Sequence, residues 1–157
     1  EERVRVQVPP GMDEGHLLRV PGYGNLGPGG PGDLYLRIRV RPHPHLERQG
    51  PDLVYRLRLG LAQAALGARV VVPGLEGPIP LDIPPGTGHG EVFALEGGGL
   101  PLPGGRGRGT LRVVVELAVP KKLSPKAQKL LRAYAEEVGE EVAPEGFWER
   151  LKGFFRK

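Results

Sequence analysis

Alternation of apolar and polar residues predicts the first strands of the chain. Three segments alternate strictly, which is the pattern of a strand with one buried and one solvent-facing side. They are Val4–Val8, Leu34–Val40 and Leu53–Leu59. Shorter apolar segments follow between Gly and Pro clusters, at the spacing of an antiparallel sandwich or barrel. These are Arg69–Pro73, Ile79–Ile83, Val92–Leu95 and Leu111–Val119. Before residue 120, a helical signal of one or two turns is expected only over Leu61–Leu66.

The pattern becomes helical after residue 120. Ser124 suits a helix N-cap, and Pro125 fits the first helical position, where a missing N–H is no loss. Gly139 is a helix-ending residue. The apolar residues between them recur at helical spacing: Ala127, Leu130, Leu131, Tyr134 and Val138. A second short helix is predicted from Glu145, with an apolar stripe formed by Phe147, Trp148, Leu151, Phe154 and Phe155.

The β-rich part repeats itself. Val8-Pro9-Pro10-Gly11 returns as Ile83-Pro84-Pro85-Gly86, and later Gly and Pro residues stay in register. Self-similarity at a fixed period indicates a repeated structural unit. The first copy has fewer residues ahead of its Pro-Pro-Gly than the second, so we expect it to be truncated and the chain to be a fragment. The predicted fold is all-β with C-terminal helices: two tandem homologous subdomains of sandwich or barrel type, then a helical segment.

Composition narrows the class of protein. The 157 residues are 39% hydrophobic and 25% charged, as in an ordinary globular protein. The absence of Cys excludes disulfides and thiolate chemistry. We find no signal peptide and no apolar run long enough to span a bilayer, so a cytoplasmic location is expected. We also expect no enzymatic activity, since no catalytic set of side chains is visible.

Two short motifs resemble ligand sites. Gly22-Tyr23-Gly24-Asn25-Leu26-Gly27 fits G-x-G-x-x-G, but a dinucleotide site needs a helix directly after it, and further glycines and a strand follow here. We interpret it as a hairpin loop. His43-Pro44-His45 supplies two of the four ligands of a tetrahedral metal site, and no further ligand cluster is near. We therefore expect a turn there and no metal or other cofactor in this fragment.

Arginines form stripes that could bind phosphates. Arg37, Arg39 and Arg41 share one predicted strand face, and the net charge is +4. Proteins that bind single strands also interleave aromatic residues for base stacking, and only Tyr35 and Tyr55 are near. We interpret the stripes as solvated strand faces and keep a nucleic-acid-binding β-domain as an alternative.

Several motifs carry a family resemblance, in chain order. Val8-Pro9-Pro10-Gly11 to Gly15 matches V-P-x-G-x-x-x-G, and Gly32-Asp33-Leu34-Tyr35 to His43 matches G-D-L-Y…V-x-x-H. Leu46 to Leu53 matches F-x-R-x-G-x-D-L, with Leu46 in place of Phe. Ala64-Ala65-Leu66-Gly67 and the Leu123–Leu131 segment match two later motifs. The chain thus resembles the C-terminal substrate-binding region of a DnaJ-type J-protein co-chaperone.

This resemblance implies an organisation and partners. It implies a partial first β-subdomain over residues 1–45, a second over 46–120, and a helical dimerisation segment over 121–157. The implied function is the binding of unfolded client polypeptides for delivery to a DnaK-type chaperone. That partner would act mainly through a J-domain, and its His-Pro-Asp motif is not in this chain. The alternative to client binding is nucleic-acid binding or a purely structural dimerisation module.

The resemblance also suggests site residues. It places a client groove in the first subdomain, at Val4 and Leu36, with Val6 and Ile38 as same-face neighbours; plain core packing is the competing interpretation. It assigns homodimerisation to the C-terminus. The candidate residues there are Leu130, Leu131, Tyr134, Phe147, Trp148, Leu151, Phe154 and Phe155. Two other placements of the aromatic tail stay open, against its own second subdomain or on an anionic membrane surface.

Overall fold

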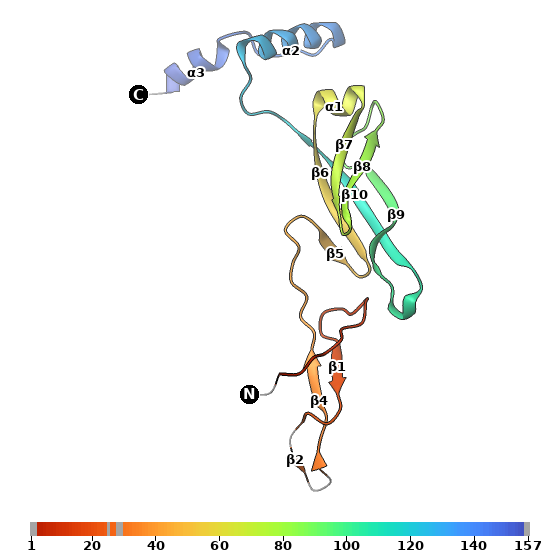
Figure 1. The fold of residues 1–157 in the computed structure, drawn as a ribbon. Coiled ribbons are helices and arrows are strands. Elements are labelled where there is room, and N and C mark those ends of the chain that lie inside the picture. Colours follow the sequence, from red (N-terminus) through yellow and green to blue (C-terminus); the bar gives the residue numbers. More distant parts are fainter. Residues whose placement is uncertain (1–2, 25, 28–29, 156–157) are drawn as a thin grey trace. The chain divides into compact units, whose positions relative to one another are not determined.

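A computed structural model describes residues 3–24, 26–27 and 30–155 (Figure 1). The side chains of 26, 27, 31 and 155 lie outside the described set. The chain divides into two compact units, Glu1–Ala118 and Val119–Lys157, and each is described by itself. The predicted division at residues 45 and 120 stays a prediction.

The first copy of the repeat forms two small antiparallel ribbons. Strand β1 (Leu17–Val20) pairs with β4 (Leu34–Arg37), and β2 (Leu26–Gly27) pairs with β3 (Gly30–Pro31). The predicted Leu34–Val40 strand is shorter in the structure, because regular pairing ends at Arg37. The Ile38 amide still donates to the His16 carbonyl at 2.8 Å, so the ribbon continues irregularly.

The N-terminal segment is not a strand, contrary to the prediction for Val4–Val8. Its side chains do alternate, since Val4 and Val6 are half-buried while Arg3, Arg5 and Gln7 are exposed. A strand requires hydrogen bonds to a neighbour, however, and the backbone of residues 3–8 makes none with the described residues. Alternation of apolar and polar residues indicates which side chains are buried, but it does not show whether a neighbouring strand is there to pair with.

The second copy contains the main sheet. Its elements are β5 (Glu47–Gln49), β6 (Asp52–Gly60), α1 (Leu61–Leu66), β7 (Ala68–Gly74), β8 (Gly77–Ile83), β9 (Val92–Pro101), η1 (Pro103–Gly105) and β10 (Arg108–Ala118). The sheet order is β5-β6-β10-β9, and β7 and β8 form a separate antiparallel hairpin. The predicted strands and the short helix are confirmed, and β9 extends beyond its predicted end through the glycines at 97–99.

One pairing departs from the expected antiparallel arrangement. β6 and β10 run parallel, with Leu53 opposite Leu111 and Leu59 opposite Leu117. A parallel pair needs a long crossover connection, and here α1, the β7–β8 hairpin and β9 supply it. Strand direction depends on this non-local connection, so short-range alternation could not predict it.

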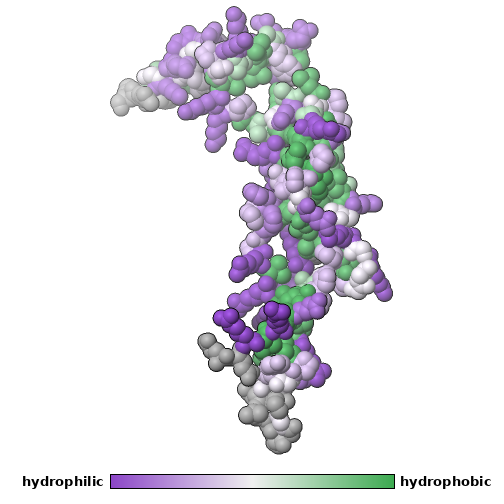
Figure 2. Space-filling model, viewed as in Figure 1, coloured by the Kyte–Doolittle hydropathy of each residue, from purple (hydrophilic) through white to green (hydrophobic). Residues whose placement is uncertain are grey.

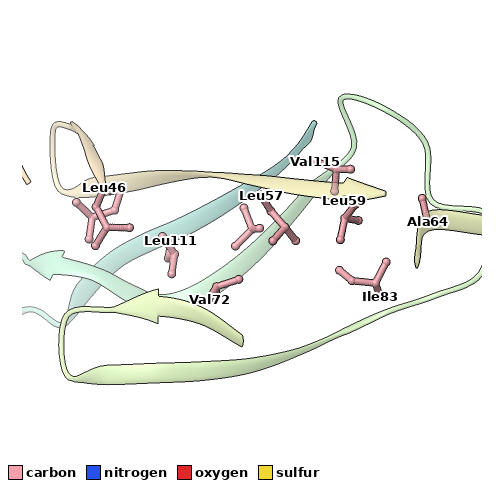
Figure 3. Packing of buried hydrophobic residues seen from close by; sticks show 10 residues of the cluster. Leu46, Leu57, Leu59, Ala64, Val72, Ile83, Leu111 and Val115 are labelled. Carbon is pink, nitrogen blue, oxygen red and sulfur yellow. The ribbon is translucent and has the colours of Figure 1, made fainter. Parts of the chain in front are cut away.

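The core lies between the main sheet and the β7–β8 hairpin (Figure 3). Leu111 and Val115 from β10 and Val72 from β7 are fully buried. Leu46 and Ala64 cover other parts of this cluster. Apolar side chains from both layers therefore meet, as in other two-layer β domains.

The duplication extends to individual hydrogen bonds. In the first copy Gly15 N donates to Ile38 O at 3.0 Å, and in the second Gly90 N donates to Val115 O at 2.8 Å. Leu18 opposes Leu36 just as Phe93 opposes Val113. Gly24 and its counterpart Gly99 each pack against the backbone of the following strand, where a Cβ atom would collide. The two copies therefore share register as well as sequence.

The C-terminal unit is helical. In α2 (Pro125–Val138) the Ser124 hydroxyl accepts from Ala127 N at 3.1 Å, and Gly139 ends the helix in the left-handed conformation. These bounds match the prediction. Helix α3 (Phe147–Phe155) begins two residues after the predicted Glu145, because Pro144 to Gly146 form the preceding turn. The fold is thus all-β followed by C-terminal helices.

Candidate functional site

The β1–β4 ribbon has two different faces. One face carries Leu18, Val20, Leu34 and Leu36, which are half-buried or buried. Ile38, beyond the end of β4, is also half-buried. On the opposite face Leu17 and Tyr35 are 60% and 59% exposed. The predicted client residues Leu36 and Ile38 therefore belong to the less exposed, apolar side.

The second copy provides an internal reference for these positions. Leu36 corresponds to Val113 and Ile38 to Val115, and both valines have 0% exposure. The first copy leaves partly accessible the positions that the second copy buries in its core. The residues that cover them in the second copy include Leu57 and Val72, which precede its Pro-Pro-Gly, and the shorter segment ahead of the first Pro-Pro-Gly has no counterparts for them.

The four predicted client residues come from two segments. Leu36 and Ile38 lie at the end of the β1–β4 ribbon, and Val4 and Val6 lie in the unpaired N-terminal segment. All four are half-buried. No hydrogen bond joins these two segments within the described part of the chain. Their combination into one groove stays a prediction.

The arginines at the end of β4 and after it differ from Arg56 of β6 in their ion pairs. Arg37, Arg39 and Arg41 are exposed and make no ion pair with any described residue. In the second copy, Arg56 bonds Glu47 at 3.2 Å and Glu116 at 3.3 Å. Those two hydrogen bonds, Glu47 first, raise the pKa of Arg56. The arginines of the two predicted stripes therefore differ in their partners among the described residues.

Asp52 joins strands of the main sheet by polar contacts. Its carboxylate accepts from Thr110 N at 2.8 Å and from Arg112 Nη1 at 2.7 Å. The Thr110 hydrogen bond, followed by that of Arg112, lowers the pKa of Asp52. Asp52 belongs to the matched G-x-D-L motif, so its role here is to hold β6 beside β10.

A cavity of about 610 Å³ lies where the first copy meets the second. Its lining includes the buried Leu46 and Leu53, with Asp13, Glu14 and Arg41 also contributing. Sequence reasoning missed this cavity, because its walls come from the Pro-Pro-Gly turn, the strand exit and β5. The residue in the sequence that could have indicated this junction is Arg48, which lies in a matched motif.

Arg48 crosses this junction. Its Nη2 donates to Met12 O at 3.0 Å, its Nε donates to Gly50 O at 3.1 Å, and it pairs with Asp13 at 3.6 Å. The Arg48 guanidinium thereby connects the turn after the first Pro-Pro-Gly to the β5–β6 hairpin. It is the arginine of the matched R-x-G motif, whose spacing alone does not reveal this partner.

The C-terminal unit exposes apolar side chains on both helices. Arg132 Nη1 donates to Ala143 O at 2.8 Å, which ties α2 to the connection before α3, and Ala135 of α2 is buried. Most of the other apolar side chains on these helices are exposed. Exposed fractions of 38–75% are found for Leu130, Leu131, Tyr134, Val138, Phe147, Trp148 and Phe154. Leu151 is half-buried, and the Phe155 side chain lies outside the described set.

Polar side chains lie among these apolar ones on one face of the C-terminal unit. In the face shown in Figure 2, hydrophilic side chains surround the apolar ones on the C-terminal unit. Phe147 and Trp148 contact each other edge to face, with ring centroids 5.3 Å apart. Six of the eight predicted dimerisation residues are therefore exposed, and dimerisation itself stays a prediction.

The remaining motifs have structural roles. His43 Nδ1 accepts from His45 N at 3.0 Å and from Leu46 N at 3.1 Å, so this ring caps the strand-exit turn. No group of metal-binding side chains occurs in the described ranges. The glycines at 22 and 24 lead into the β2–β3 ribbon and not into a helix. Every helix in the described part of the chain is too short or too polar to cross a membrane.

Comparison with known proteins gives a consistent family. The model of the DnaJ C terminal domain matches residues 1–120. The Chaperone protein DnaJ of Ruminiclostridium cellulolyticum is 42% identical over 99% of this chain and 42% of its own length. Those of Acetivibrio thermocellus and Methanothermobacter thermautotrophicus are 43% and 42% identical, over 99% and 95% of this chain and 39% and 40% of theirs.

The chain thus spans about two fifths of the length of these relatives. The match includes both repeat copies, and the motifs that carry the resemblance lie at the turns and strand ends described above. The shared register of the two copies, the sequence motifs and the family model all indicate the same family. The chain therefore belongs to the DnaJ C-terminal domain family.

Proposed function

We propose that this chain captures unfolded client polypeptides on its first repeat and forms homodimers through its C-terminal helices, as part of a co-chaperone that delivers clients to a DnaK-type chaperone. The observation that carries client capture is the apolar face of the β1–β4 ribbon. Leu36 and Ile38 lie half-buried on this face, at positions that the resemblance assigns to the client groove or to its same-face neighbours. The proposed role is non-catalytic.

The N-terminal segment suits strand addition. Residues 3–8 have backbone groups that bond no described residue, and Val4 and Val6 present half-buried side chains. An extended client can pair with such a backbone whatever its sequence, while shallow apolar contacts favour aromatic and aliphatic side chains. Because the backbone would supply the hydrogen bonds and the side chains only a preference for apolar residues, we expect broad client specificity.

The test uses the 157-residue chain and a permanently unfolded client, reduced and carboxymethylated α-lactalbumin carrying a fluorophore. Anisotropy titration measures the dissociation constant. We expect Leu36→Asp to weaken binding about tenfold or more, because an apolar contact of about 1.5 kcal/mol is lost. Leu17→Asp is the matched control, since Leu17 lies on the exposed face of the same ribbon, and it should bind as the parent chain does.

Circular dichroism accompanies both variants. If Leu36→Asp unfolds the chain, Leu36 is core, and Val6→Asp then tests the groove from the unpaired segment. Equal binding by the parent, Leu36→Asp and Val6→Asp, all folded, contradicts the proposed groove.

The nucleic-acid alternative has its own supporting observation, the unpaired Arg37, Arg39 and Arg41 beside the exposed Tyr35. Salt distinguishes the two functions. Binding through phosphate contacts falls steeply as salt rises, whereas client capture through apolar contacts should persist. Tight binding of a single-stranded oligonucleotide that salt abolishes, with no client binding, would favour the alternative.

A further inference from the structure

The turn that follows each Pro-Pro-Gly continues the strand pairing of its copy by single hydrogen bonds. In the second copy Gly90 N donates to Val115 O and Val115 N donates to Glu91 O, both at 2.8 Å. In the first copy Ile38 N donates to His16 O, also at 2.8 Å. Both turns thus extend the ladder beyond the point where regular strand pairing ends.

The next amide along each strand is bound by a side chain. In the second copy Leu117 N donates to His89 Nδ1 at 3.1 Å, and in the first copy Val40 N donates to the Glu14 carboxylate. His89 and Glu14 occupy equivalent positions, each directly before the glycine of its turn. A side chain therefore supplies the acceptor in both copies, but the chemical group differs.

The two kinds of acceptor respond differently to acid. An imidazole accepts a hydrogen bond only through an unprotonated nitrogen, and with both nitrogens protonated it can only donate. Imidazole side chains usually take up this second proton between about pH 5 and about pH 8, whereas carboxylates stay ionised down to about pH 4. A proton on Nδ1 of His89 therefore removes the acceptor for the Leu117 amide, and a carboxylate in its place would still accept.

The charged groups around His89 belong to its own turn and to the strand ends beside it. They are Glu91 of the turn, Glu116 of β10, and Arg56 and Arg58 of β6. Helix α1, which also lies beside β10, carries no titratable side chain. Glu91 accepts from Gly88 N at 2.8 Å, and Glu116 bonds Arg56 at 3.3 Å. None of these groups forms an ion pair with the His89 ring in the described ranges, so the Leu117 amide is the group with which a proton on Nδ1 competes.

Leu117 lies at the boundary between the two compact units. Strand β10 ends at Ala118, and the helical unit begins at Val119. The His89 ring is exposed, so it can exchange protons with water while the chain stays folded. Loss of its bond to Leu117 frees the end of β10 from the turn and adds residues to the connection that leads to the helices.

We propose that His89 is a pH-sensitive clip on the end of β10. The neutral ring holds the Leu117 amide, and protonation below about pH 6 releases this strand end and lengthens the connection to the helical unit. The clip does not depend on client binding.

Amide hydrogen exchange of the 157-residue chain, followed by NMR at about pH 7.5 and about pH 5, tests the proposal. After correction for the intrinsic effect of pH on exchange, protection of the Leu117 amide should fall about fivefold on acidification, as for the loss of an ordinary hydrogen bond. His89→Glu installs the residue of the first copy and should give equal protection at both pH values. Unchanged protection in the parent, or an equal fall in His89→Glu, overturns the proposal.

His45→Gln is the matched control. It removes a different exposed histidine, whose ring packs edge-on against His43 with centroids 6.1 Å apart. The Leu117 amide of this variant should respond to pH as it does in the parent. A response that disappears here as well would have its cause elsewhere than His89, against the proposal.

A second measurement keeps the test decisive if circular dichroism shows that His89→Glu misfolds. In the parent chain, the NMR shifts of the His89 ring proton on Cε1 and of the Leu117 amide should change with the same midpoint, because one proton causes both changes. Different midpoints, or a Leu117 amide that does not shift while the ring titrates, overturn the proposal.

Discussion

At the residue scale, single side chains accept hydrogen bonds from backbone amides at equivalent positions of the two copies. Glu14 accepts from Val40 N, and its repeat counterpart His89 accepts from Leu117 N at 3.1 Å. The two copies thus cap the same backbone position with different side chains. Conserved geometry here does not require a conserved residue, because any acceptor of suitable reach satisfies the amide.

Ser124 gives a first prediction. Replacing it by Ala removes the acceptor for Ala127 N and should destabilise the C-terminal helical unit by about 1 kcal/mol. Ser124→Asp is the control and should retain the stability, because a carboxylate caps as well as a hydroxyl. Thermal melting followed by helical circular dichroism measures both. Equal loss in the two variants would show that the cap contributes nothing.

Asp52 gives a prediction about pH. Its pKa is lowered in the folded chain, first by the Thr110 amide and then by Arg112. A carboxyl with a depressed folded pKa contributes stability that is fully present above its unfolded value of about 3.9 and is lost as pH falls through the folded pKa. Asp52→Asn should therefore be less stable than the parent near neutral pH, and the difference should shrink below about pH 4.

Urea unfolding at several pH values measures this difference. Asp82→Asn is the control, since Asp82 bonds the exposed Arg69 at the hairpin surface. A pH-independent gap between the parent and Asp52→Asn would contradict the assigned cause.

At the element scale, the sequence predicted the helices and strands better than it predicted which strands pair with each other. The bounds of α2 follow from Ser124 and Gly139, because capping acts within one turn of the chain. The strand at Leu53–Leu59 follows from alternation alone. The parallel partner of β6 and the missing partner of Val4–Val8 depend on residues far away in sequence, which no short window contains.

Core truncation in the two copies tests their unequal burial. Leu111 is fully buried and its counterpart Leu34 is half-buried. We expect Leu111→Ala to cost about 2–5 kcal/mol of unfolding free energy, as for other buried leucines. Leu34→Ala should cost clearly less, because part of the side chain already contacts water. Urea denaturation compares them, and equal costs would mean that the first copy buries this position as well as the second does.

At the scale of the whole molecule, the exposed C-terminal side chains predict self-association. Soluble monomers rarely expose a dense apolar surface without a partner, and a two-fold contact would cover Leu130, Leu131 and Trp148 on both chains. Deleting residues 140–157 should lower the mass measured by light scattering from dimer to monomer. Glu149→Gln, which keeps every apolar residue, is the control and should stay dimeric.

Two results would change this assignment. If the chain still dimerises after the deletion, the dimer contact lies in α2 or elsewhere in the chain. A parent chain that is already monomeric refutes dimerisation of these residues.

The candidate site was partly visible in the sequence. The resemblance matched Val4 and Leu36 to the client groove, and Val6 and Ile38 were added as same-face neighbours. Arg48 lay within a matched motif but was not named as a site residue. The cavity beside Arg48 was not visible, because its walls come from segments that lie far apart in the sequence.

The parallel pairing of β6 with β10 has a consequence for folding order. β6 lies near the start of the second copy and β10 at its end, so the core cannot close until nearly the whole copy is available. Such non-local contacts slow folding, since a long loop must be ordered before they form. During synthesis the apolar face of β6 stays uncovered until β10 leaves the ribosome. A nascent chain of this family is then itself an unfolded polypeptide with exposed strand edges, the kind of chain that needs a chaperone.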